Sequence, residues 1–233
     1  MTNIPTVFWW YGALGVGVMI LVAAFLFIAT GKELRADRRR KVDLAAVAAR
    51  INADYLPDDP SVLQWFTGTP FHPYSRRAAA TGVMRGQVGE AHAIFFDLDV
   101  ETALDADTSV HYKQTVAMFH LGEGGMPAFS LERRGDDALA DDFTGPGAKP
   151  LVELPGNPAF SSKFRLTGDD AEAIRKLFSA KLCAFIDANA DWAIESTGAW
   201  IAVCRKRVRP DIDAYHAFVG EAAEFPRAFG TRG

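Results

Sequence analysis

The sequence predicts an α+β protein with one N-terminal transmembrane helix and a basic helical stalk, followed by an antiparallel β-sheet domain covered by two helices. Three observations predict this fold. Residues 7–28 carry no charged side chain. Several segments between residues 83 and 206 have strand composition and are separated by turn residues, which is typical of antiparallel strands. Two later segments repeat apolar residues at helical spacing.

The uncharged run is long enough to span a bilayer. At about 1.5 Å rise per residue, residues 7–28 would cross a hydrocarbon core of roughly 30 Å. Trp9, Trp10 and Tyr11 stand at its start, where an aromatic belt is expected. A cleaved signal peptide carries positive charge before a shorter apolar core, whereas here the charge follows the core. We therefore expect a membrane anchor over residues 1–31.

Basic residues follow this run directly. They are Lys32, Arg35, Arg38, Arg39, Arg40 and Lys41. Because such residues stay on the cytoplasmic side, we expect the N-terminus outside and the remaining chain in the cytoplasm, at the inner membrane of a bacterium. The same side chains either set this orientation alone or also bind anionic lipid. Residues 32–55 are expected to form the basic juxtamembrane helix.

A small-residue face within the apolar run is a candidate partner surface. Gly12, Ala13 and Gly17 would let a second transmembrane helix approach closely. The expected partners are therefore the lipid bilayer and, through this face, another membrane protein.

Composition limits the class of the remaining chain. The 233 residues carry a net charge of −4, and residues 42–233 alone carry −8. This acidic balance argues against a nucleic-acid-binding protein. We expect one α+β domain over residues 56–226 and a tail over residues 227–233. Cys183 and Cys204 lie outside any metal or redox spacing and are expected to be buried apolar side chains.

An aromatic and basic segment precedes the strands. It contains Trp65, Phe66, Phe71, Tyr74, Arg76 and Arg77. These side chains either dock on a partner or the bilayer, or close one end of the hydrophobic core.

Strands are expected in a meander and in a second hairpin. The meander strands are residues 83–89, 93–101, 110–121 and 128–133, and brief strands follow at 151–154 and 160–166. The hairpin strands are residues 192–195 and 199–206, with Trp192, Ile194, Trp200 and Ala202 directed inward. Asp169 and Glu172 resemble a capping box that begins a helix ending at Ala188. A last helix is expected between Pro210 and Pro226.

Three carboxylates form the sharpest candidate for ligand binding. Asp97, Asp99 and Glu101 share one strand face and would hold a divalent cation or a basic partner. The alternative is a solvated strand face paired with residues such as Lys113, because same-face neighbours lie roughly 7 Å apart. The five histidines have no metal-ligand spacing, and no nucleophile motif is present. We therefore expect no metal, no cofactor and no enzymatic activity.

Five segments of the later chain form a pattern: RRAAATGVMRG (76–86), FFDLDVE (95–101), KQTVAMF (113–119), PAFSLE (127–132) and FSSKFRLTGDDAEAIRKLF (160–178). This pattern resembles a family of uncharacterised bacterial single-pass membrane-anchored proteins. Leu98 departs from the aromatic residue that many relatives have after the strand aspartate. The resemblance implies an anchored α+β cytoplasmic domain and brings no known activity or catalytic residues.

These observations favour a non-enzymatic accessory or scaffolding subunit that binds a membrane-protein partner. The alternative is a lipid- or small-ligand-binding domain at the membrane surface, which would use the aromatic and basic segment.

Overall fold

The computed structural model describes residues 19, 31–32, 34–65, 75–103, 109–122, 126–135 and 149–230. The chain forms two compact units, Met1–Asp43 and Leu44–Gly233. The described residues 34–50 are helical. In the first unit this helix carries an exposed ion pair between Arg39 and Asp43, with Nε and Oδ2 separated by 3.9 Å.

The prediction of a transmembrane helix is wrong. In the described part of the chain, no helix has the length and apolar character needed to cross a membrane. The helix over residues 34–50 is amphipathic and charged, because Arg35, Arg39 and Arg50 are exposed along it. Of residues 7–28 only Met19 is described, so Trp9, Trp10, Tyr11, Gly12, Ala13 and Gly17 lie outside the described residues. The predicted orientation depended on that span and has no support.

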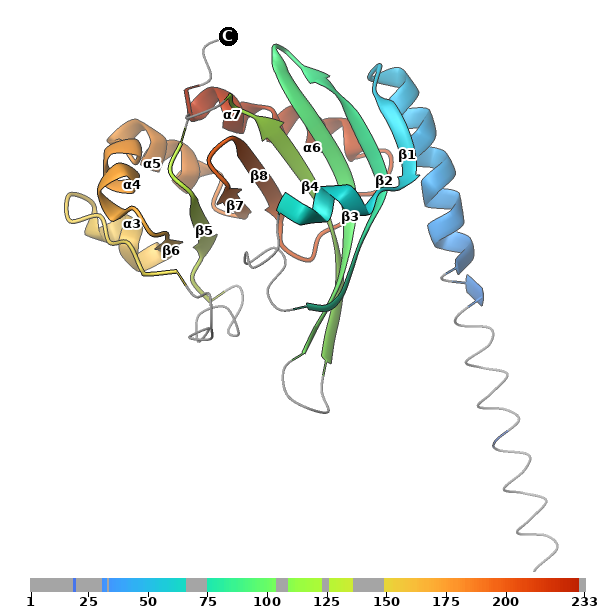
Figure 1. Ribbon diagram of the computed structural model, residues 1–233, viewed down its shortest axis with the longest axis horizontal. Helices are drawn as coiled ribbons and strands as arrows, with labels where there is room; N and C mark the ends of the chain where they lie inside the picture. The colour runs from blue at the N-terminus through green and yellow to red at the C-terminus, as the bar shows by residue number, and fades with distance from the viewer. Residues whose placement is uncertain are drawn as a thin grey trace, which may run out of the picture. The chain divides into compact units, whose positions relative to one another are not determined.

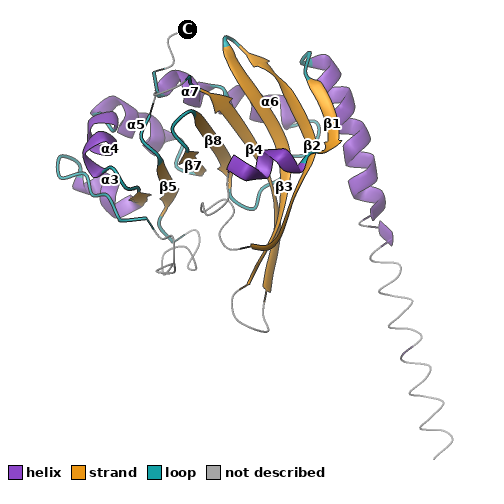
Figure 2. Cartoon of the chain, in the orientation of Figure 1, coloured by secondary structure: helices purple, strands orange, loops and turns teal. Residues whose placement is uncertain are grey.

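The second unit contains an eight-stranded antiparallel sheet in the order β1-β2-β3-β4-β8-β7-β5-β6 (Figures 1 and 2). The strands are β1 (Asp54–Asp58), β2 (Ser75–Val88), β3 (Ala91–Ala103), β4 (Ser109–His120), β5 (Phe129–Arg133), β6 (Phe164–Thr167), β7 (Trp192–Ser196) and β8 (Trp200–Arg205). Three strands of the predicted meander are confirmed as β2, β3 and β4, whereas the fourth, over residues 128–133, is β5, which pairs with β6 and β7 and not with β4. The meander is extended by β1, which pairs with β2 at one edge.

The alternating pattern of β3 gives the sheet two buried faces. Phe95 belongs to one hydrophobic core and Phe96 to another, as the period of two in a strand requires. Both side chains are almost fully buried. The sheet is therefore covered on both sides, and its strands separate two cores.

The face of the sheet that carries Phe95, the first face, is covered by more helices than the two expected. They are α3 (Pro158–Lys163), α4 (Ala171–Leu177), α5 (Ala180–Ala188), α6 (Tyr215–Ala222) and α7 (Glu224–Ala228). Their buried side chains share a core with Phe95, Phe119 and Phe129 of the sheet, and Leu44 of the N-terminal helix joins the same core. Helix α7 continues beyond Pro226, and Phe229 after it is still 9% exposed, within the same core.

Side-chain caps explain two differences from the predicted elements. The helix expected to run from Asp169 to Ala188 is divided into α4 and α5, because the Ser179 hydroxyl accepts a hydrogen bond from Leu182 N (3.3 Å) and begins a new helix. Asp170 caps α4 by accepting from Ala173 N (2.9 Å). The strand expected over residues 160–166 is confirmed only from Phe164, where β6 begins; the residues before it are helical, because Asn157 caps α3 in the same way.

The opposite face is covered in part by the short 3₁₀ helix η1 (Pro60–Trp65), which lies in front of β3 in Figure 1. Val62 of η1 is fully buried in the second core. Trp192 and Ile194 belong to the first core, whereas Trp200 and Ala202 pack in the second. The predicted common inward face of this hairpin is therefore wrong, because a sheet with two buried faces places apolar residues on both.

Candidate functional site

Three aromatic rings from different elements meet on the face opposite the helices. The ring of Trp65 at the end of η1 lies 5.6 Å from that of Trp200 on β8. The Trp200 ring lies 5.0 Å from the His120 ring on β4. His120 and Trp200 are direct cross-strand partners. Trp65 remains 36% exposed, so this aromatic cluster (Trp65, Trp200 and His120) presents a tryptophan to the surroundings.

Helix η1 is held in place by an ion pair and a cap. Asp59 Oδ1 accepts a hydrogen bond from Ser61 N (3.0 Å), and Asp59 Oδ2 accepts one from Arg85 Nη2 on β2 (2.6 Å). Hydrogen bonding from the Ser61 side chain and from Arg85 lowers the pKa of Asp59, so this carboxylate stays charged. The position of Trp65 is thus set by contacts at both ends of η1, together with the buried Val62.

The candidate partner surface is described only in part. Trp65 lies in the aromatic cluster, Arg77 is exposed on β2 opposite Glu101, and the backbone of Arg76 lies in β2. Phe66, Phe71 and Tyr74 lie outside the described residues. Sequence reasoning missed His120 and Trp200 as neighbours of Trp65, because their proximity depends on the pairing of β4 with β8, which are distant in sequence.

The candidate lipid-facing residues lie on the N-terminal helix. Lys32, Arg35, Arg38 and Arg39 are exposed, whereas Arg40 and Lys41 are partly buried. The helix therefore presents at least four basic side chains to solvent, which is the arrangement that attracts an anionic surface.

An ionic cluster with two buried carboxylates lies on the second face of the sheet. It consists of Glu132, Lys149, Arg165, Glu195 and Lys206. Ser130 Oγ donates a hydrogen bond of 2.5 Å to Glu195 Oε2, and Lys149 Nζ lies 3.7 Å from Glu195 Oε1. Glu195 is fully buried, and this desolvation raises its pKa to about 7 despite Ser130 and Lys149. The carboxyl therefore exchanges its proton near neutral pH.

Both cysteines are buried. Desolvation raises the pKa of the Cys204 thiol to about 12 and also raises the pKa of Cys183. The expectation of two buried small side chains is confirmed. Because the thiolate is the nucleophilic form, neither side chain is activated for covalent chemistry.

The acidic side chains of β3 lie in different surroundings. Asp97 is 4% exposed and accepts a hydrogen bond from Thr115 Oγ1 (2.6 Å). Asp99 contacts His111 and lies 3.8 Å from Lys113 Nζ, its cross-strand partner. The expected pairing of this face with Lys113 is therefore confirmed, whereas the expectation of a solvated face is wrong at Asp97, which is buried. Across the described ranges, no three or more His, Cys, Asp or Glu side chains gather as a metal site.

Comparison with known proteins gives one match by structure. No protein-family model and no curated protein matches this sequence, so the resemblance noted above stays a prediction. The crystal structure of the mycobacterial trehalose monomycolate transport factor A matches with a TM-score of 0.53 and 13% sequence identity. The match covers 84% of this chain and 96% of that one. The two proteins share a fold.

Proposed function

We propose that this chain is a non-enzymatic accessory protein that binds a membrane-protein partner. The observation that carries the proposal is the fold shared with a transport factor over 96% of that factor's chain. The name of that protein gives it a role in transport, and we extend from it a binding role to this chain in preference to a catalytic one.

The aromatic cluster is the surface we assign to the partner. Exposed tryptophan that rests on other rings is a frequent centre of protein interfaces, because it buries a large area at little cost in conformational entropy. Trp65 meets this description, with Trp200 beneath it and the buried Val62 fixing its helix. Its 36% exposure leaves contact area for a partner.

The basic side chains of the N-terminal helix would bring the chain to the membrane surface. Each Lys or Arg close to an anionic leaflet contributes about 1 kcal/mol of attraction. Lys32, Arg35, Arg38 and Arg39 are exposed and available for this contact. Surface attraction would concentrate the chain where a membrane-protein partner resides.

Photo-crosslinking from a defined position tests the partner surface. A photoreactive phenylalanine in place of Trp65 is expected to form one dominant adduct with a membrane protein in the native cells. The matched control places the same group at Val208, which is 45% exposed and lies outside the aromatic cluster. Equal adducts from both positions, or adducts from neither, would contradict the proposal.

The alternative is a domain that binds lipid or a small ligand at the membrane surface, and the exposed ring of Trp65 favours it as well. Flotation of the full chain with protein-free vesicles separates the two functions. Binding to anionic vesicles that weakens with salt and requires Trp65 would favour the lipid-binding function. If replacing Trp65 by Ala leaves flotation unchanged, the aromatic cluster does not bind lipid, and the result favours a protein partner for it.

A further inference from the structure

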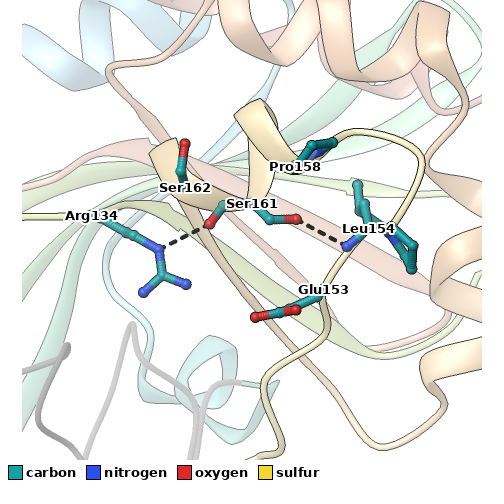
Figure 3. Close-up of a pocket in the computed structure, with 7 residues that line it drawn as sticks. Arg134, Glu153, Leu154, Pro158, Ser161 and Ser162 are labelled. Atoms are coloured by element: carbon teal, nitrogen blue, oxygen red, sulfur yellow. Dashed lines mark hydrogen bonds between the residues drawn. The ribbon is translucent and has the colours of Figure 1, made fainter.

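A pocket of about 390 Å³ lies beside helix α3 (Figure 3). It is formed by the end of β5, the loop over residues 151–157 and helix α3. Its lining residues are Arg134, Glu153, Leu154, Pro155, Pro158, Ser161 and Ser162. This volume is at the lower end of the range for small-molecule sites.

Hydrogen bonds hold the walls of the pocket in place. Leu154 N donates to Ser161 Oγ (2.9 Å), which ties the loop to α3. Arg134 N donates to Lys163 O (3.0 Å), and Arg134 Nε donates to Ser161 O (3.1 Å), which ties the end of β5 to the same helix. Leu154 is 6% exposed and anchors the loop in the hydrophobic core. The pocket is therefore formed before any ligand arrives.

Two opposite charges in this pocket are not paired with each other. Arg134 uses only Nε for its side-chain hydrogen bond, and no carboxylate among the described residues lies within 4.0 Å of its guanidinium. The Glu153 carboxylate likewise has no cation or hydrogen-bond donor among those residues. Its backbone carbonyl is fixed by Arg175 Nε at 3.0 Å. Figure 3 shows the Glu153 carboxylate extended toward the side of the pocket where Arg134 lies.

We propose that this pocket binds a small zwitterion, with the ligand's carboxylate or phosphate on Arg134 and its ammonium group on Glu153. The two free Nη groups of Arg134 form a planar fork that matches two oxygens of an anionic group. Ser161 accepts a hydrogen bond from Leu154 N, so its own O–H remains to donate to the same anion.

Other ligand classes fit the lining less well. A plain anion would leave the Glu153 carboxylate next to added negative charge, which is unfavourable. A sugar ring usually stacks on an aromatic side chain, and none of the lining residues is aromatic. The N-terminus of α3 contributes little, because Asn157 Oδ1 already accepts from Phe160 N (3.2 Å).

Free amino acids and free phosphoethanolamine carry this pair of charges, and so does the headgroup of phosphatidylethanolamine. The inference goes beyond the accessory role. It is tested by ligand binding to the purified chain, without a partner protein. Failure of the photo-crosslinking experiment would therefore not count against the zwitterion site. Likewise, failure to bind a zwitterion would not count against the accessory role.

Calorimetric titration of the full chain in uncharged detergent tests the site. The probes are alanine, phosphoethanolamine, dihexanoyl phosphatidylethanolamine, inorganic phosphate and ethanolamine. We expect at least one zwitterion to bind roughly 10-fold more tightly than phosphate or ethanolamine alone, since it engages both charged side chains. Preference for alanine identifies an amino acid as the ligand. Preference for phosphoethanolamine identifies the free headgroup, and preference for the short-chain lipid identifies a membrane source.

Two variants and a control complete the test. Arg134→Gln and Glu153→Gln should each lower the affinity for the preferred zwitterion by roughly 10-fold or more. Both side chains are on exposed residues, so unchanged circular dichroism is expected. Arg133→Gln, at the exposed neighbouring position, should leave the affinity unchanged. The proposal would be overturned if none of the zwitterions bound. It would also be overturned if phosphate bound as tightly as the preferred zwitterion and Glu153→Gln had no effect on the affinity.

Discussion

Glu195 makes the stability of this fold depend on pH in an unusual direction. Its carboxyl is fully buried, and burial raises its pKa from 4.5 to about 7. Between these two values the folded protein holds a proton that the unfolded chain has already released. Raising the pH through this window therefore destabilises the fold, and the loss is complete above the folded pKa.

The size of the effect follows from the two pKa values. One pKa unit corresponds to about 1.36 kcal/mol, so a single group with these values destabilises the fold by roughly 2–3 kcal/mol between about pH 5 and about pH 8. Glu195→Gln keeps an acceptor for the Ser130 hydroxyl, which donates to Glu195 Oε2 at 2.5 Å, and removes the titration. The variant should therefore gain roughly 2–3 kcal/mol relative to the natural chain over that range.

Urea unfolding followed by tryptophan fluorescence measures this difference, because Trp192 is 2% exposed in the folded state. Glu172→Gln is the matched control, since the Glu172 side chain is 81% exposed and its loss should change the free energy of unfolding by less than about 0.5 kcal/mol. The difference in free energy of unfolding between the natural chain and Glu195→Gln should differ between about pH 5 and about pH 8. If it were the same at these two pH values, the raised pKa of Glu195 would be refuted.

Three further predictions concern packing and reactivity. Gly168→Ala should lower the free energy of unfolding by roughly 1–3 kcal/mol in urea titrations, because the added methyl group would lie 2.7 Å from the backbone oxygen of Ala128; an unchanged midpoint would contradict this close packing. Leu44→Ala should cost about 2–5 kcal/mol, since Leu44 is 1% exposed, and a loss below about 1 kcal/mol would show that the helix does not belong to the core. Cys183 and Cys204 should resist a thiol reagent at neutral pH until urea unfolds the chain, since burial raises both pKa values; rapid labelling of the folded protein would disprove their inert state.

Much of the sheet could be predicted from the sequence because strand patterns are local. The alternation of Phe95, Phe96, Asp97 and Leu98 has a period of two, and the structure places these residues on opposite faces as that period requires. The pairing of Asp99 with Lys113 followed from the same pattern and the length of the hairpin.

Features that depend on contacts between distant segments could not be predicted. Residues 160–163 have strand-like composition, yet the Asn157 cap makes them helical, and the strand begins only at Phe164. Glu195 follows Ile194 in an ordinary alternating strand, and only the covering of the second sheet face buries its charge. The aromatic cluster requires η1, β4 and β8 to meet, and no local signal specifies that meeting.

The most direct test of the accessory role is the mass and composition of the particle that contains the full chain, purified from its native cells in mild detergent. The account predicts a defined complex in which this chain and a distinct membrane protein are present in fixed proportion. Recovery of the chain alone, as a monomer, would contradict it.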